Sequence, residues 1–118
     1  MLMEKINYPD GNPVKIEFIS VKEYPLHTHN DLEIIYVLEG DIDLQLSYYT
    51  YHLSEKDIHI VNTKDIHGIY SKNKASLLLI LYVNMDYFER YHPDLKKIIF
   101  FCGEYYNHHN YTKVKRIT

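Results

Sequence analysis

The residues of this chain with the clearest capacity for chemistry are His27, His29 and Glu33, which lie close together in the sequence. In an extended strand His27 and His29 point to the same face, because successive side chains alternate. A chain reversal at Asn30-Asp31 is expected to bring Glu33 onto the neighbouring strand, beside the two rings. His67, which follows a later predicted strand, is expected to complete the group. Imidazoles and a carboxylate on one concave face form a suitable shell for a divalent transition metal ion.

Short strands between residues 14 and 83 are the elements that must position these side chains. Val14–Ile19 and Asp41–Leu46 alternate between apolar and polar residues, whereas Leu32–Leu38 is apolar throughout and is expected to be buried from both sides. The Glu39-Gly40 pair is expected to reverse the chain, since glycine tolerates positive φ. Further strands are expected at residues 51–53, 58–61, 66–70 and 76–83. Short strands at roughly ten-residue spacing predict an all-β antiparallel barrel or sandwich.

The alternation also predicts which side chains share a face. Ile16 and Phe18 lie on one face of the first strand. The strand Asp41–Leu46 is expected to turn three residues inward, Ile42, Leu44 and Leu46.

The pattern changes after Val83. Asn84 or Asp86 is expected to cap a short helix that ends at Pro93. Lys97–Phe101 is expected to form one more strand. We therefore expect a single domain in three parts, an N-terminal arm (1–13), a barrel (14–102) and a polar tail at the start of a truncated linker (103–118).

Composition limits the classes of function. The chain has 118 residues, of which 46% are apolar and 25% charged, as expected of one folded domain. Its single Cys102 cannot form an internal disulfide, and neither a signal peptide nor a membrane span is recognisable, so we expect a cytoplasmic protein with no membrane partner. A net charge of −3 with scattered basic residues predicts that this chain alone does not bind DNA.

The spacing His-x-His-x3-Glu-x6-Gly resembles the first motif of the cupins, and four residues match it, His27, His29, Glu33 and Gly40. His67 occupies the histidine position of the second cupin motif, Gly-x5-Pro-x-Gly-x2-His-x3-Asn. The other positions hold different residues, Lys56, Asn62, Lys64 and Ser71. The resemblance implies a cupin-type antiparallel β-barrel (a double-stranded β-helix, or jelly roll) with a short C-terminal helical and strand extension.

Within the cupins, the chain is similar to the N-terminal sensor domains of AraC-type transcription regulators. The similarity rests on residues 33–38 before Gly40, on Leu53–Asn62, and on the segment after the barrel as far as Cys102. In that family a linker helix and two helix-turn-helix units follow. The resemblance therefore implies a domain that binds a small-molecule effector, such as a sugar, and reaches DNA only through a C-terminal domain absent from this chain. It also implies a homodimer.

Under this interpretation the ligand-binding residues are His27, His29, Glu33, Tyr36, His67 and Tyr82, with core packing as the competing interpretation for the two tyrosines. The three histidines and Glu33 either hold a divalent metal ion (Zn, Ni, Mn or Fe) or, without one, form a hydrogen-bonding rim for the effector. No residue is assigned a catalytic role. The alternatives are a stand-alone metal-dependent cupin enzyme, such as a dioxygenase or isomerase, and a sugar-binding or storage module.

Overall fold

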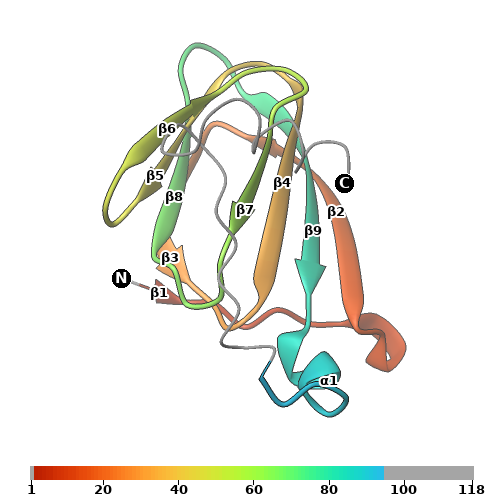
Figure 1. Cartoon of the computed structure of the whole chain (residues 1–118). Coiled ribbons are helices and arrows are strands. Elements are labelled where there is room, and N and C mark those ends of the chain that lie inside the picture. Colours follow the sequence, from red (N-terminus) through yellow and green to blue (C-terminus); the bar gives the residue numbers. More distant parts are fainter. Residues whose placement is uncertain (1, 95–118) are drawn as a thin grey trace.

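Strands account for most of the regular structure. The computed structural model describes residues 2–94. Its elements are β1 (Leu2–Met3), a 3-10 turn η1 (Pro9–Gly11), β2 (Val14–Val21), β3 (Glu23–Thr28), β4 (Leu32–Glu39), β5 (Ile42–Leu46), β6 (Thr50–Leu53), β7 (Ile58–Val61), β8 (His67–Ser71), β9 (Ser76–Val83) and α1 (Met85–Glu89) (Figure 1). The all-β prediction is confirmed.

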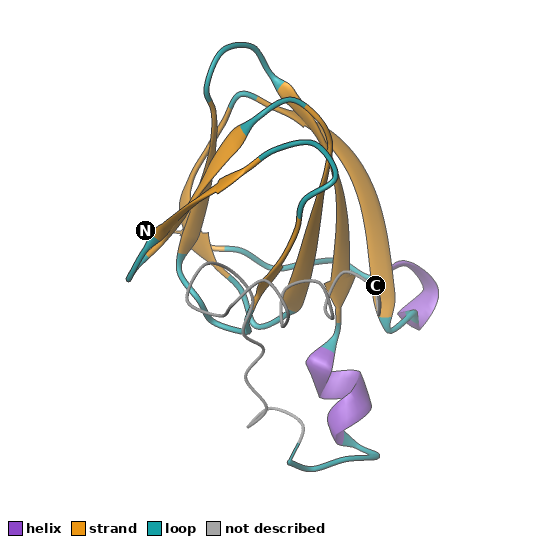
Figure 2. Ribbon diagram, turned by 45° about the horizontal axis from the view of Figure 1, so that its top comes forward, coloured by secondary structure: helices purple, strands orange, loops and turns teal. Residues whose placement is uncertain are grey.

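The strands form two sheets that face each other around a common interior (Figure 2). One sheet has the order β1-β3-β8-β5-β6 and the other the order β2-β9-β4-β7. Neighbouring strands are antiparallel, except that β1 pairs parallel with β3. Strands far apart in sequence lie side by side in both sheets, as a jelly roll requires.

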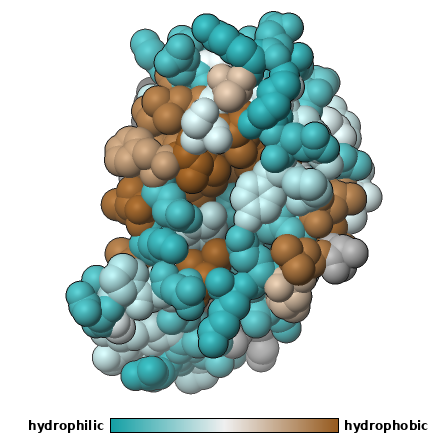
Figure 3. Space-filling view, turned by 180° about the vertical axis from the view of Figure 1, so that it is seen from behind, coloured by the Kyte–Doolittle hydropathy of each residue, from teal (hydrophilic) through white to brown (hydrophobic). Residues whose placement is uncertain are grey.

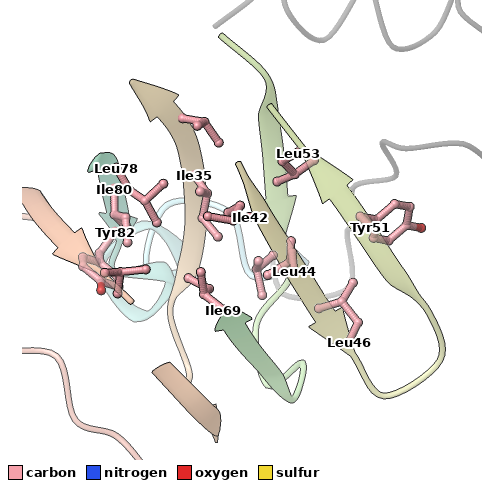
Figure 4. Packing of buried hydrophobic residues seen from close by; sticks show 13 residues of the cluster. Ile35, Ile42, Leu44, Leu46, Tyr51, Leu53, Ile69, Leu78, Ile80 and Tyr82 are labelled. Atoms are coloured by element: carbon pink, nitrogen blue, oxygen red, sulfur yellow. The ribbon is translucent and has the colours of Figure 1, made fainter. Parts of the chain in front are cut away.

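The apolar core fills the space between the two sheets (Figure 4). On the four-stranded sheet, Ile35 lies opposite Ile80 and Val37 opposite Leu78, and none of the four is more than 1% exposed. From the facing sheet Ile42, Leu44 and Leu46 are 0–3% exposed, which confirms their predicted inward orientation.

Strand β2 presents its largest apolar residues to the outside. Ile16 and Phe18 share a face, as predicted, but 61% and 69% of their surfaces are exposed. Their partners on β9 are Leu81 and Leu79, which alternate with the inward-facing core residues of that strand. Viewed from behind, apolar side chains gather on one side of the molecular surface (Figure 3). The alternation of β2 therefore predicted a strand but did not predict which face is buried.

Replacing Gly40 by alanine is expected to destabilise the fold by about 2 kcal/mol. Gly40 has φ of +101°, and a Cβ there would lie against the Ser76 side chain and 3.1 Å from its Cα. Ser76 cannot move easily, because its N–H donates to the buried Ser71 hydroxyl at 3.2 Å. Gly11 is the control, since its φ of +69° is also positive but no atom lies within 4 Å of a Cβ there. Equal losses of unfolding free energy for Gly40→Ala and Gly11→Ala, measured by urea unfolding, would show that the contact with Ser76 is not the cause.

Helix α1 begins where the sequence predicted and ends earlier. The Asn84 side chain caps it, accepting hydrogen bonds from the N–H groups of Asp86 and Tyr87. The helix stops at Glu89, before Pro93, and its Met85 packs against Leu32 of β4. The strand expected at 97–101 falls outside the described residues. Within residues 2–94, no helix combines the length and the apolar character needed to cross a membrane.

Candidate metal and ligand site

Three histidines and one glutamate meet inside the barrel. His27 lies near the end of β3 and His29 directly after it, while His67 begins β8 and pairs with His27 across the ladder. Glu33 comes from β4, which lies in the facing sheet and not beside β3 as expected, because the chain crosses from one sheet to the other between the two strands. All four residues are 0–3% exposed, and one ligand atom from each lies within 4.8 Å of the others. The structure thus brings together the four residues that were expected to converge.

Backbone carbonyl groups fix the tautomer of all three rings. Each Nδ1 lies 2.9–3.1 Å from a carbonyl oxygen two residues away, in the pairs His27 with Pro25, His29 with Asp31, and His67 with Asp65. A carbonyl oxygen only accepts hydrogen bonds, so each Nδ1 carries a proton and donates it. In the neutral ring Nε2 then has a free lone pair, which is the form that binds a metal ion.

The Nε2 atoms of His29 and His67 face the same carboxylate oxygen. They lie 2.8 Å and 3.3 Å from Glu33 Oε1. If both rings are neutral, the two Nε2 atoms and Glu33 Oε1 are all hydrogen-bond acceptors and repel one another. A positive charge, from a proton or a metal ion, is needed to hold them this close. A proton on His29 would satisfy one contact, but His67 Nε2 is buried and makes no hydrogen bond to any residue that the structure describes.

A divalent ion would satisfy all these acceptors at once. Ligand atoms about 2.1 Å from one ion lie roughly 3–4 Å apart, so small side-chain movements would close the cluster around a metal. Three imidazoles and one carboxylate form a ligand set between hard and soft donors, which suits Zn, Ni, Mn or Fe. The residues present therefore fit the metal ion that the sequence pattern implies.

The electrostatics of the cluster favour an ionised carboxylate. Burial alone raises the pKa of the Glu33 carboxyl, but the hydrogen bond with His29 and the electrostatic interaction with the nearby His29 and His67 rings outweigh it and lower the pKa to about 2. For His29 burial lowers the pKa, but contact with Glu33 more than compensates and the net shift is upward. The carboxylate thus supplies a fixed negative charge for a cation.

The two tyrosines assigned to the pocket lie on opposite sides of the sheet. Tyr82 is 4% exposed, pairs with Glu33 across the ladder, and places its ring 5.7 Å from that of His29, edge to face. Tyr36 pairs with Leu79 and lies three residues from Glu33, so it faces the outside of the barrel. The structure therefore brings Tyr82 to the cluster and does not bring Tyr36 there.

The N-terminal arm adds a carboxylate that sequence reasoning did not identify. The N–H of Glu4 donates to the Thr28 carbonyl at 2.7 Å, extending the pairing of β1 with β3. One Glu4 oxygen accepts a hydrogen bond from the Tyr24 hydroxyl, and the Tyr24 ring stacks on His27. The other oxygen is buried without a hydrogen bond in the described structure and lies 3.8 Å from His27 Nε2. No spacing in the sequence signals this contact, because it depends on the parallel pairing of β1.

Residues 16–113 match the family described as the AraC-like ligand binding domain. No curated protein matches the chain.

Several solved structures share the fold at low sequence identity. An RmlC-like cupin from Shewanella frigidimarina is 20% identical with a TM-score of 0.57, covering 61% of this chain and 67% of that one. KdgF from Halomonas sp. is 20% identical with a TM-score of 0.58, covering 62% and 72%. The cupin domain of Cnp3 from Schizosaccharomyces pombe is 12% identical with a TM-score of 0.63, covering 74% and 67%. At these identities the likeness identifies the fold alone.

Proposed function

Because the chain belongs to the family of AraC-like ligand-binding domains, we propose that its barrel senses a small-molecule effector on behalf of a transcription regulator. The observation that supports this proposal is the buried cluster of His27, His29, Glu33 and His67. Its acceptor atoms face one another inside the barrel, where buried polar groups without partners are costly. A cluster of this kind is suited to a bound ion and to an effector that contacts it.

We assign the four residues as ligands of one divalent ion, Zn, Ni, Mn or Fe. When bound, the ion would supply positive charge and a coordination position for an oxygen atom of the effector. The chain's own residues do the rest. Backbone carbonyls hold the rings through Nδ1, Glu33 balances the charge, and Tyr82 packs against His29 and shields the cluster from water.

The regulator would read DNA through a separate helix-turn-helix domain. Residues 2–94 contain one α-helix, of five residues, and the whole chain carries a net charge of −3. Effector binding would favour one of two arrangements of the barrel relative to its DNA-binding partner domain. We further propose that the regulator acts in the cytoplasm as a homodimer.

The test is transcriptional. In the host organism, a chromosomal Glu33→Gln substitution is compared with deletion of the whole gene and with the exposed control His52→Gln, and protein abundance is measured in each strain. We expect Glu33→Gln at normal abundance to alter the same group of transcripts as the deletion, with no change for His52→Gln. Transcript levels that are unaffected by the deletion would refute a regulatory role.

A second candidate is a metal-dependent enzyme, and the donor set itself favours it, since a buried ion with an open position can also polarise a substrate. The two functions differ in what happens to the bound molecule. A sensor binds its effector reversibly and releases it unchanged, whereas an enzyme loaded with metal converts many molecules per chain. Mass spectrometry of a binding compound recovered after prolonged incubation distinguishes them.

A further inference from the structure

The N-terminal arm places a second carboxylate beside the metal cluster. Strand β1 pairs with β3 at the edge of the five-stranded sheet (Figure 1), and the residue that follows β1 is Glu4. The Nε2 atoms of His29 and His67 face the Glu33 carboxylate. The Nε2 atom of His27 instead faces the Glu4 carboxylate, with 3.8 Å between Nε2 and Oε1. Each histidine of the cluster therefore has a carboxylate oxygen next to its Nε2.

Glu4 Oε1 and His27 Nε2 are both hydrogen-bond acceptors. The proton of the neutral His27 ring lies on Nδ1 and is donated to the Pro25 carbonyl, so Nε2 carries a lone pair. Glu4 Oε1 is buried and has no hydrogen-bond partner among the residues that the structure describes. A separation of 3.8 Å is too long for a hydrogen bond, but an ion bonded to each atom at about 2.1 Å spans it. The pair is therefore better matched to a shared metal ion than to a shared proton.

Two further contacts hold Glu4 in this position. Its other carboxylate oxygen accepts a hydrogen bond from the Tyr24 hydroxyl, and the Tyr24 ring stacks on His27 with ring centroids 4.1 Å apart. The backbone N–H of Glu4 donates to the Thr28 carbonyl at 2.7 Å. Contacts of this kind orient the side chains that bind metal ions. Glu4 thus has one oxygen held by Tyr24 and the other directed at a cluster histidine.

The arm contacts the surroundings of the cluster at a second point, Tyr8. The Tyr8 hydroxyl donates to the Asp31 carboxylate, and the Asp31 backbone carbonyl accepts the Nδ1 proton of His29. The Tyr8 ring also packs against the apolar core. Terminal segments are usually poorly ordered unless a contact ties them to the domain. An ion shared by Glu4 and the cluster would tie the arm more firmly.

We propose that Glu4 is a fifth ligand of the ion, so that the N-terminal arm supplies part of the metal site. The proposal rests on the metal site assigned above to His27, His29, Glu33 and His67, and extends that site beyond the barrel strands. Binding of the ion fastens the arm to β3. Without the ion, the arm depends on a short strand pairing and on the side-chain contacts of the arm itself.

The first test measures Zn(II) affinity by competition with a chromophoric chelator. Glu4→Gln keeps an acceptor for the Tyr24 hydroxyl but loses the charge, and we expect the Kd for Zn(II) to rise at least about 10-fold. Glu23→Gln is the matched control, because Glu23 is an exposed carboxylate on the same strand as His27, and its affinity is expected to be unchanged. Thermal unfolding checks that each variant folds.

The second test measures hydrogen exchange at the Glu4 amide by NMR, with and without Zn(II). This amide is the donor to Thr28, so its exchange rate reports whether the arm is attached. We expect Zn(II) to slow the exchange at least about 10-fold in the wild type and much less in Glu4→Gln. If Glu4 had only a structural role, Zn(II) would have the same effect in both proteins.

Three outcomes would overturn this assignment. Unchanged Zn(II) affinity in Glu4→Gln, with a loss in His67→Ala, would remove Glu4 from the site and leave the four-residue cluster intact. An equal loss in Glu23→Gln would show that only the net charge of the chain matters. No binding of Zn(II) by the wild type would refute the metal site as a whole, and this inference with it. The sensing function is tested separately, by the transcript comparison of Glu33→Gln.

Discussion

Replacing His67 by alanine is expected to lower the affinity of the chain for Zn(II) at least about 100-fold, or about 2.7 kcal/mol. His67 is fully buried, and its Nε2 faces Glu33 without a hydrogen bond in the described structure. Loss of residues that only support metal ligands already costs about 10–100-fold in affinity, so loss of a ligand is expected to cost at least as much. Competition with a chromophoric chelator measures the effect.

Two control variants locate the metal site. His52 is a histidine outside the cluster whose side chain is 61% exposed, and His52→Ala is expected to leave Zn(II) affinity unchanged. The sequence also contains adjacent histidines, His108 and His109, and their double replacement by alanine is expected to have no effect. Wild-type affinity in His67→Ala, or a large loss in the double variant, would place the metal elsewhere.

Acid is expected to destabilise the fold through His59. Burial lowers its pKa from 6.5 to about 4, so between these values the unfolded chain binds a proton that the folded chain does not. Stability therefore rises with pH across this window, and its loss on acidification begins as pH falls through 6.5. The lowered pKa of His59 is expected to reduce the free energy of unfolding by about 2 kcal/mol at pH 5 and by about 3 kcal/mol near pH 4.

Urea unfolding of the wild type and His59→Phe between pH 7 and pH 4 isolates this contribution. The variant has no ring nitrogen to protonate, so acid should lower its free energy of unfolding less than that of the wild type. His52→Phe is the matched control, because that side chain is largely exposed, and it is expected to follow the wild-type curve. Parallel curves for the wild type and His59→Phe would contradict the assignment of His59 as a buried neutral ring.

The metal cluster could be predicted from sequence because its geometry is mostly local. His27 and His29 are two residues apart, so strand alternation places them on one face. Glu33 follows after one short reversal, which keeps it near them, although alternation does not predict that β4 lies in the facing sheet. The strand pattern of β5 likewise predicted its inward residues, since its apolar and polar faces differ clearly. Only His67 needed long-range information, which the cupin-like spacing supplied.

The features that escaped prediction depend on register and on which face of a strand is buried. Alternation shows that Ile16 and Phe18 share a face, but the pairing of β2 with β9 decides that this face lies outside. Tyr36 is a different case, because its odd separation from Glu33 on β4 places it on the outer face by strand alternation alone. The apolar neighbours of His59 would suggest an outward histidine, yet pairing with Ile35 turns it inward.

The contact between Glu4 of the N-terminal arm and His27 also could not be predicted from the sequence. Its approach to His27 depends on a parallel pairing of two residues, Leu2 and Met3, with β3. Neither residue belongs to a periodic pattern in the sequence. Such a contact arises only when the barrel has formed, so local preference cannot reveal it.

X-ray absorption spectroscopy of the chain loaded with one equivalent of Zn(II) shows directly whether three histidines and Glu33 hold one ion in the barrel. We expect a first shell of three imidazole nitrogens and carboxylate oxygen at about 2.0–2.2 Å, and one imidazole fewer in His67→Ala. A shell with fewer than two imidazoles, or one that His67→Ala leaves unchanged, would contradict it.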